Sequence, residues 1–513
     1  MKVKRALISV FDKSGLEAFA KGLTGMGVQI ISTGGTARML EESGIPVTQV
    51  EEVTGFPEML DGRVKTMHPR LMAGILARRD VPGHMSTIAE HGIEPIDMVV
   101  CSLYPFEEVA GQRGVEDAVV IENIDIGGPS MIRAAAKNHG GVAVVTSNED
   151  YDGILEEMGQ SDGALTTETL RDLAARAFHR TAHYDCVIAS WFSETEGDFP
   201  DYVMRDYEKV LDLKYGENPH QRAAYYAEIG LRQHLLSEVE QLHGQQLGFN
   251  NLYDLHAARA ICDEFTLPCV VIIKHNNPCG CALAESLAAA YDRAYACDPV
   301  SAFGSVIAVN RTVDVPLAER LKELFVEVLF APSYEEEALA ILTEKAGIRI
   351  LRSDERRRSN PGELDYKRVA GGILVQDRDS DVEERDEMTV ATTRHPSEQE
   401  WGDLIFAFRV AKHVKSNAIV IARDLATVGV GAGQMSRVDS TRIAIEKARS
   451  DLHGAVAGSD AFYPFPDAVE MAIESGVTAF MQPGGSKGDE SAVEACDAHG
   501  VAMVMTGRRH FLH

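Results

Sequence analysis

The sequence predicts an α/β protein with more than one domain, in which strands and helices alternate. The chain has 513 residues, whereas a single hydrophobic core stops growing at roughly 250–300 residues. Short apolar runs alternate with amphipathic segments in the N-terminal part, which favours a mostly parallel sheet with helices on both faces. Hydrophobic residues make up 45% of the chain and charged residues 25%. This composition is typical of a folded enzyme and excludes extensive disorder.

The N-terminal elements are predicted in order from hydrophobic spacing. Strands are expected at residues 6–10, 28–31, 97–101 and 142–146. Apolar residues at helical spacing over 16–23 predict a helix after the turn at 12–15, and a second helix is expected to end near 43–46. Loops at the carboxyl ends of parallel strands form ligand sites, so the loops at 12–15 and 32–36 are the first candidates.

A polar, turn-forming stretch that begins near Ser193 predicts the domain boundary. We expect domains at residues 1–195 and 208–513, with a linker at 196–207. In the second part, apolar strands at 269–273 and 418–422 are each followed by a turn and a helical stretch. This similarity is a weak indication of an internal duplication.

Charge and cysteine content restrict the class of protein. The chain has 50 Lys and Arg against 78 Asp and Glu, a formal net charge of -28. Such acidity disfavours nucleic acid and anionic membranes as partners. The eight cysteines are sparse and mostly occupy apolar runs, which predicts reduced buried thiols. The first apolar stretch is too short for a signal peptide, and no run approaches the roughly 18 residues of a membrane span, so we expect a cytoplasmic protein.

The loop Ser32-Thr33-Gly34-Gly35-Thr36 has the composition of a phosphate site. Glycines let the backbone approach closely, and a helix N-terminus offers free N–H groups to an anion. An ordinary tight turn between a strand and a helix would have the same composition. Lys13-Ser14 on the neighbouring loop favours the phosphate site, because adjacent parallel strands deliver both loops to one crevice.

Further N-terminal motifs are ambiguous one at a time. Arg63 and Lys65 alternate in Gly-Arg-Val-Lys-Thr-Met-His-Pro and would share a face in extended chain, although a solvated charged loop is the common alternative. Leu-Tyr-Pro-Phe at 103–106, Ile-Asp-Ile-Gly-Gly-Pro at 124–129 and Arg-Ala-Ala-Ala-Lys-Asn at 133–138 could each serve packing alone.

In their order and spacing, these motifs resemble the IMP cyclohydrolase domain of the bifunctional PurH family, over about residues 1–195. That domain has the methylglyoxal-synthase-like fold. The resemblance implies that phosphate and ribose are held by Lys13, Ser14, Thr33, Gly35, Thr36, Arg63 and Thr66. It further implies that the formyl oxygen is polarised and protons are moved by Lys65, Tyr104, Asp125 and Lys137. Which of these four is the base stays open.

A second group of candidate residues, in the C-terminal part, begins with Lys274-His275, which ends an apolar strand. Burial there is expected to disfavour both charged forms and to favour proton transfer near neutral pH, although a lone Lys or His is usually structural. Pro278-Cys279 is similar to part of a zinc-deaminase motif, but Asn277 stands where the catalytic Glu would be needed, and Ala282 stands where the second Cys would be. We therefore expect no catalytic metal. The Gly-x-Gly-x-Gly string at 429–433 lacks the final spacing of a dinucleotide-binding fingerprint.

Together with segments at 214–221, 301–304, 415–418, 429–437 and 509–511, this motif resembles the transformylase domain of the same family, from about residue 205 to the end. That domain has a duplicated, zinc-free, cytidine-deaminase-like fold. The resemblance implies His275 as the base, Lys274 as the charge-stabilising group and Asn417 as the formyl-holding group. The nucleotide and its phosphate would be bound by Arg437, Arg509, Lys214, Tyr215 and Gly304. Lys214 stands where family members often have Arg, so its phosphate contact would be less bidentate.

The resemblance implies two consecutive reactions of de novo purine biosynthesis. A formyl group passes from the co-substrate 10-formyltetrahydrofolate to the amine of 5-aminoimidazole-4-carboxamide ribonucleotide (AICAR), and the formylated product then closes to IMP with loss of water. It also implies a homodimer and allows a structural K+ ion. Two alternatives are a triose-phosphate lyase of the methylglyoxal synthase type and a regulatory nucleotide-binding module. Neither explains ionisable residues in two domains.

Overall fold

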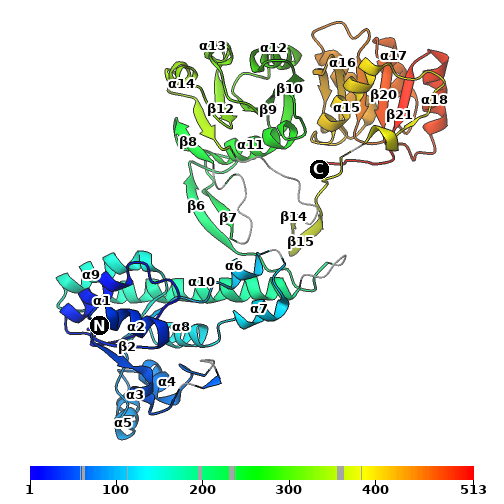
Figure 1. Cartoon of the computed structure of the whole chain (residues 1–513). Helices are drawn as coiled ribbons and strands as arrows, with labels where there is room; N and C mark the ends of the chain where they lie inside the picture. Colours follow the sequence, from blue (N-terminus) through cyan, green and yellow to red (C-terminus); the bar gives the residue numbers. More distant parts are fainter. Residues whose placement is uncertain are drawn as a thin grey trace. The chain divides into compact units, whose positions relative to one another are not determined.

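The computed structural model describes the chain except residues 58, 61–63, 113, 194–198, 230–235, 237–238, 355–362 and 383. Two compact units are present, Met1–Tyr207 with Glu228–Arg232, and Glu208–Ala227 with Gln233–His513 (Figure 1). Residues 196–198 of the expected linker lie outside the described residues. Strands β6 (Tyr207–Leu213) and β7 (Ala223–Glu228) form a separate two-stranded sheet where the units meet in sequence.

The N-terminal unit contains a five-stranded parallel sheet in the order β3-β2-β1-β4-β5. Its strands are β1 (Arg5–Ser9), β2 (Gln29–Ser32), β3 (Val47–Gln49), β4 (Met98–Cys101) and β5 (Ala143–Val145). The four predicted strands are confirmed to within two residues at each end. Strand β3 was not predicted, because three half-buried residues carry too little hydrophobic pattern.

Helices surround this sheet and close its core (Figure 1). They are α1 (Leu16–Gly25), α2 (Gly34–Glu42), α3 (Val50–Thr54), α4 (Pro69–Leu76), α5 (Pro82–Glu90), α6 (Phe106–Ala110), α7 (Asp117–Glu122), α8 (Gly127–Lys137), α9 (Tyr151–Gln160) and α10 (Thr167–Phe192). Leu16, Phe19 and Leu23 are fully buried on one face of α1, as their helical spacing predicted. The long helix α10 packs against both α8 and β5.

The C-terminal unit is built from two halves with the same order of elements. The first half contains α11 (Phe249–Cys262), β9 (Cys269–Lys274), β10 (Asn277–Leu283), α12 (Leu287–Cys297), β11 (Ser305–Val309), α13 (Val315–Glu323), β12 (Val326–Ala331), α14 (Glu336–Thr343) and β13 (Arg349–Arg352). The second contains α15 (Glu398–Ala411), β17 (Ile419–Arg423), β18 (Ala426–Gly431), α16 (Arg437–Lys447), β19 (Val456–Ser459), α17 (Asp467–Glu474), β20 (Ala479–Gln482), α18 (Asp489–Ala498) and β21 (Ala502–Met505). The weakly indicated duplication is therefore confirmed.

The two halves share one twelve-stranded sheet. Its order is β16-β21-β20-β19-β17-β18-β10-β9-β11-β12-β13-β8, with β8 at Glu240–His243 and β16 at Thr389–Val390. Antiparallel pairing of β10 with β18, at Ala282 and Ala426, joins the halves. The antiparallel hairpins β9–β10 and β17–β18 therefore lie side by side at the centre, where the two sequence motifs meet. A separate hairpin is formed by β14 (Leu364–Val369) and β15 (Gly372–Asp377).

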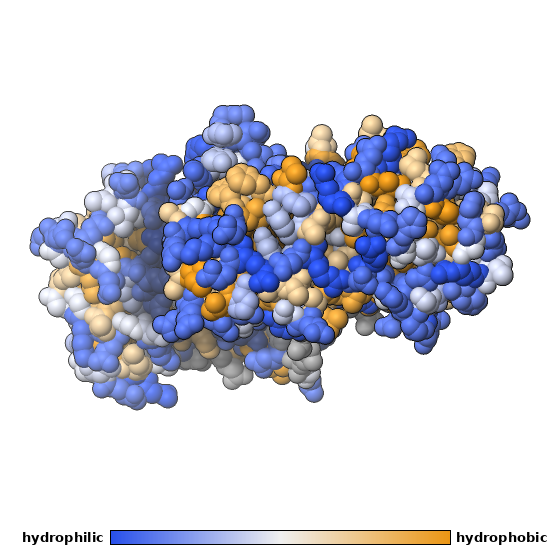
Figure 2. All heavy atoms as spheres, turned by 90° about the horizontal axis from the view of Figure 1, so that it is seen from above, coloured by the Kyte–Doolittle hydropathy of each residue, from blue (hydrophilic) through white to orange (hydrophobic). Residues whose placement is uncertain are grey.

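The hydrophilic surface and the free cysteine thiols agree with the composition of the chain. The face shown in Figure 2 is mainly hydrophilic, with hydrophobic residues in several small groups. All eight cysteines are free thiols, and all but Cys186 are buried. Among the helices built from described residues, none has the length and apolar character needed to cross a membrane.

Candidate active sites

Three loops of the N-terminal unit meet at one edge of its sheet. Strand β1 lies between β2 and β4, and the parallel strands end together at Ser9, Ser32 and Cys101. The strand order reverses next to β1, since β2 and β3 lie on one side of it and β4 and β5 on the other, and open parallel sheets bind ligands at such a point. Predicted residues from three separate segments are thereby brought to one crevice. Arg63 lies outside the described residues.

Two lysines converge on the N-terminus of α2. A Cβ placed on Gly34 would lie 2.9 Å from Lys65 Nζ, and one on Gly35 would lie 3.5 Å from Lys13 Nζ. Gly34 also has φ +48°, a conformation that favours glycine. The first turn of a helix leaves N–H groups without intrahelical partners and carries partial positive charge. Two ammonium groups beside such a terminus form an arrangement that can bind a phosphate.

The hydroxyl groups of this loop have structural partners. Thr36 Oγ1 donates to the Val10 carbonyl at 3.0 Å and accepts the Val10 N–H at 3.4 Å, and Ser32 Oγ donates to the Ile8 carbonyl. Thr33 and Thr36 are both buried. The backbone and the lysines, rather than the Thr36 hydroxyl, therefore face an incoming anion.

Asp125 lies at the start of α8 beside two glycines. Its Oδ1 accepts the Gly128 N–H at 2.8 Å, and a Cβ on Gly128 would overlap its Oδ2. A Cβ on Gly127 would lie 2.5 Å from Thr66 Oγ1. Burial raises the pKa of the Asp125 carboxyl, while backbone hydrogen bonds from Gly128, Tyr104 and Gly127 act in the opposite direction. The glycine pair thus lets Asp125 and Thr66 approach the same helix end.

Tyr104 belongs to this cluster and Lys137 does not. Tyr104 is exposed and its ring meets the ring of Phe11 edge-on, with 6.0 Å between the centroids. Lys137 is the last residue of α8, whereas Asp125 precedes the first. Eleven helical residues rise about 16 Å, so the exposed Lys137 lies at the opposite end of the helix.

In the C-terminal unit, Lys274 ends strand β9, and His275 begins the tight turn that leads to β10. Lys274 is half-buried, and its Nζ donates to the Phe303 carbonyl at 2.6 Å. A Cβ on Gly304 would lie 4.0 Å from the same Nζ, so Lys274 and Gly304 are neighbours. The expected burial of His275 is wrong for this chain. The turn residue has φ +53° and is exposed, because it projects beyond the strand end.

Asn277 connects this turn to the second half of the unit. Its Nδ2 donates to the His275 carbonyl at 3.1 Å, and its Oδ1 accepts the Lys415 N–H at 3.1 Å. Lys415 is two residues before Asn417. The predicted base and the predicted formyl-holding residue, which lie far apart in sequence, are thus joined through one side chain. From the sequence, Asn277 stands out only because it occupies the place of the zinc-deaminase glutamate.

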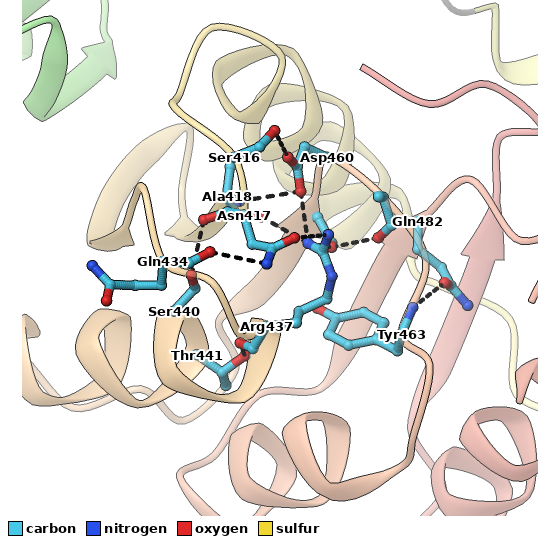
Figure 3. A network of polar contacts seen from close by, with 12 residues as sticks. Ser416, Asn417, Ala418, Gln434, Arg437, Ser440, Thr441, Asp460, Tyr463 and Gln482 are labelled. Carbon is cyan, nitrogen blue, oxygen red and sulfur yellow. Dashed lines mark hydrogen bonds and ion pairs between the residues drawn. The ribbon is translucent and has the colours of Figure 1, made fainter. Parts of the chain in front are cut away.

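Asn417 is held by a buried network that includes Arg437 (Figure 3). Arg437 Nη2 donates to Asn417 Oδ1 at 2.7 Å, and Asn417 Nδ2 donates to the Gln434 carbonyl at 3.0 Å. Arg437 Nη1 pairs with Asp460 Oδ1 at 2.6 Å, and the Asp460 side chain is fully buried. Arg437 therefore fixes the orientation of Asn417. Asp460 was not recognised from the sequence, because nothing near it in the chain marks it as an ion-pair partner.

The remaining predicted cations are exposed. The Arg509 guanidinium lies over the Phe511 ring at 4.4 Å, and Lys214 Nζ is 5.9 Å from the centre of the Tyr215 ring. The Arg509 segment is tied to the Asn417 segment, since the Ser416 N–H donates to the Leu512 carbonyl at 3.0 Å. The Tyr215 carbonyl accepts the N–H of Phe249, the first residue of α11.

A pocket of about 220 Å³ adjoins the Lys274–His275 turn. Its lining includes Asn277, Asp298 and Lys447, and the last two form an ion pair at 2.9 Å. Ligand pockets for molecules of nucleotide size usually enclose about 300–1,000 Å³, so this one is small for a complete site. Within the part of the chain that the structure describes, no group of three or more His, Cys, Asp or Glu side chains could hold a metal ion.

Comparison with known proteins places the chain in a family. Residues 135–447 match the family described as AICARFT/IMPCHase bienzyme, and residues 15–130 match the MGS-like domain. The bifunctional purine biosynthesis protein PurH of Bacillus mycoides (strain KBAB4) is 49% identical over 511 residues, which cover 99% of this chain and 100% of that protein. The chain belongs to the AICARFT/IMPCHase bienzyme family.

Two further relatives extend the comparison. The protein of the same name from Ruminiclostridium cellulolyticum is 47% identical over 517 residues, which cover 100% of this chain and 100% of that protein. The one from Bacillus cereus (strain B4264) is 48% identical over 511 residues, which cover 99% of this chain and 100% of that protein. The crystal structure of ForH is 36% identical, with a TM-score of 0.35, and covers 37% of this chain and 96% of that chain.

Membership in the AICARFT/IMPCHase bienzyme family confirms the resemblance found in the motifs. It confirms an MGS-like N-terminal part, an α/β fold and an enzyme with two activities. A single-function lyase and a non-catalytic regulatory module are both inconsistent with a bienzyme match that covers residues 135–447.

Proposed function

We propose that this chain transfers a formyl group from 10-formyltetrahydrofolate to the amine of AICAR and then closes the product to IMP, at one site in each unit. The observation that carries the proposal is the joining of Lys274-His275 to the Asn417 segment through Asn277. A second cluster, around Lys13 and Lys65, lies in the other unit.

The transfer step needs a base and a positive group. The AICAR amine is conjugated with the imidazole and is a weak nucleophile, so it must lose a proton to His275 as its bond to the formyl carbon forms. Lys274 stabilises the negative charge that develops on the formyl oxygen. When the bond between the formyl carbon and the folate nitrogen breaks, that nitrogen takes up a proton from the Lys274 ammonium group.

Asn417 holds the formyl group, and Arg437 acts on the substrate through Asn417. The support is geometric, since the Arg437 guanidinium is committed to Asp460 and Asn417. The exposed cations Arg509 and Lys214 bind the nucleotide phosphate, and Tyr215 and Gly304 line the nucleotide site. These assignments extend the family resemblance to the positions of this chain.

Ring closure uses the cluster at the edge of the N-terminal sheet. By the family resemblance, the phosphate and ribose are bound by Lys13, Ser14, Thr33, Gly35, Thr36, Arg63 and Thr66. Thr36 takes part through its backbone, because its hydroxyl is hydrogen-bonded to Val10. The carboxamide nitrogen attacks the formyl carbon, and the resulting hydroxyl leaves as water after it gains a proton. Lys65, Tyr104 and Asp125 polarise the oxygen and move the protons, whereas Lys137 is too distant within one chain. Holding both reacting groups together supplies several kcal/mol of the barrier reduction.

A homodimer is part of the proposal. His275, Phe303 and Met435 are exposed around the transferase residues, and the adjoining pocket is small, so a second copy of the chain would complete the site. A structural potassium ion bound by oxygen atoms, and a cytoplasmic location, complete the proposal.

The His275→Ala variant tests the transferase assignment. Without its base this variant should lose formyl transfer by about 100-fold or more, and it should close supplied formyl-AICAR to IMP at the normal rate. Both activities can be followed by absorbance in one preparation. Formyl transfer at the wild-type rate would show that His275 is not the base.

A further inference from the structure

The same carboxylate–turn arrangement occurs in both halves of the C-terminal unit. Asp254 is the sixth residue of α11, and its Oδ2 and Oδ1 accept the N–H groups of His275 at 3.3 Å and Asn276 at 2.8 Å. Asp403 is the sixth residue of α15 and accepts the N–H groups of Asp424 at 2.9 Å and Leu425 at 2.6 Å. Each helix therefore clamps the turn of the hairpin that follows it.

These turns need a clamp because of their backbone conformation. His275 and Asn276 have φ values of +53° and +61°, and Asp424 and Leu425 have +53° and +58°. Side chains other than glycine disfavour this region, and two-residue hairpin turns that require it usually contain Asn-Gly. Such conformations persist only where the surroundings fix them. A carboxylate that accepts both turn amides provides that constraint.

The clamp carboxylates are partly removed from water. Burial raises the pKa of Asp254, and the hydrogen bonds from Asn276 and His275 and the charges of His275 and Lys274 act in the opposite direction. Burial likewise raises the pKa of Asp403, and its two backbone hydrogen bonds oppose this shift. Burial is thus the largest influence on the pKa of both carboxylates, and only Asp254 lies beside Lys274 and His275, the proposed catalytic side chains.

The two turns present different side chains. The first carries Lys274 and His275, whereas the corresponding Arg423 donates to the carbonyls of Asp451 at 2.7 Å and His453 at 3.1 Å. The Asp424 carbonyl accepts a hydrogen bond from Arg293. Arg423 and the Asp424 carbonyl are thus committed to structural contacts, while His275 is exposed next to the Asn417 segment.

We propose that Asp254 is a positioning residue for formyl transfer, and that Asp403 is its purely structural counterpart. Asp254 holds the left-handed turn so that Lys274 and His275 point into the transferase site together. This inference rests on the proposed role of Lys274 and His275. Asp254 acts through the turn rather than by touching the substrate, and it belongs to none of the sequence motifs described above.

The duplication supplies the matched control. In the full-length chain, Asp254→Asn and Asp403→Asn each keep one acceptor oxygen and place an NH2 group against the other turn amide. Both should lower the unfolding temperature by similar amounts and leave ring closure unchanged. Asp254→Asn alone should lower kcat for formyl transfer about 100-fold, because misplacing a catalytic group by about 1 Å costs that much. KM for AICAR should stay within about twofold.

A second variant distinguishes a positioning role of Asp254 from a simple loss of stability. Adding Asn276→Gly to Asp254→Asn relieves the positive φ and should recover unfolding temperature without recovering kcat. Wild-type kcat in Asp254→Asn, an equal loss of kcat in Asp403→Asn, or recovery of kcat with the glycine would each overturn the inference. The His275→Ala result separates this inference from the assignment on which it rests, since a fully active His275→Ala enzyme would show that His275 is not the base, whatever Asp254→Asn does.

Discussion

Lys65 and Lys13 bring two positive charges to a helix end that already favours an anion. The distances to Gly34 and Gly35 show why glycine is needed, because any larger side chain would fill the space in front of the α2 amides. Lys65 lies one residue before Thr66, which contacts Gly127 at the start of α8. This short segment therefore connects the expected phosphate site to Asp125.

Replacing Lys65 with Ala should separate the two activities. We expect ring closure to fall by about 100-fold or more, because a charge that stabilises the reacting oxygen is lost. Formyl transfer to AICAR should stay within twofold of wild type, since its residues lie in the other unit. Measuring formyl-AICAR and IMP in the same reaction checks both rates. An equal loss of both activities would contradict the assignment of two sites.

Arg437 shows how a residue can serve a site without reaching the ligand. Its ion pair with Asp460 is buried, and removing one partner of a buried pair typically costs about 3–5 kcal/mol, because the other charge is left without compensation. Its second N–H group orients the Asn417 amide. The family resemblance predicts Arg437 as a nucleotide-binding residue, whereas in the structure its guanidinium contacts Asp460 and Asn417.

At the level of elements, two glycines allow the central hairpins to pack against their helices. A Cβ on Gly280 of β10 would overlap the Ala294 carbonyl of α12, and one on Gly429 of β18 would overlap the Ala444 carbonyl of α16. Each half of the unit thus uses a glycine in the second hairpin strand for the same close approach. The position of the Lys274–His275 turn depends on this packing.

Gly280→Ala should therefore destabilise the C-terminal unit. Because the added methyl meets backbone that cannot rotate away, we expect a loss of about 3 kcal/mol in the free energy of unfolding. Gly402→Ala, within helix α15, is the control, since the added Cβ would lie 3.8 Å from Leu425 Cδ2, an ordinary contact distance. That change should raise the free energy of unfolding by up to about 1 kcal/mol. Calorimetry of both variants measures the effect, and equal transition temperatures would contradict it.

For the molecule as a whole, the two sites carry out consecutive steps. Formyl transfer to a weak amine gains little free energy. Rapid conversion of the formylated product at the second site would therefore shift the transfer equilibrium toward product. In the proposed function, the duplicated C-terminal unit supplies one transferase turn and one structural turn, while the N-terminal unit supplies the phosphate site. The family match covers parts of both units, as expected for a bienzyme.

Dilution should affect the two activities differently if the transferase site is completed by a second copy. As the enzyme is diluted below the dissociation constant of the dimer, formyl transfer per chain should fall, whereas ring closure should fall less, because its described residues come from one unit. Sedimentation at the assay concentrations gives the oligomeric state. A monomer with full transferase activity would contradict the homodimer proposal.

Much of the fold follows from local sequence pattern. The apolar runs of β1, β2, β4, β5, β9 and β17 were predicted to within two residues at each end, because buried strands require continuous hydrophobic residues. Glycine-rich turns and the lysines beside them predict the ligand loops, and this stays a prediction. Short elements such as β3 carry too few residues for a pattern, and the exposure of His275 depends on a turn that protrudes beyond the sheet.

The sequence by itself determined the α/β class, the family, and the Lys274-His275 and Gly34-Gly35 motifs, since these depend on residues close together in the chain. Only the tertiary structure decided which distant residues meet. Asn277 reaches Lys415, Arg437 reaches Asp460, and Asp254 reaches the turn that carries His275. The length of α8 likewise separates Lys137 from Asp125. Such pairings depend on strand order and helix packing, which are set by long-range contacts that no local pattern encodes.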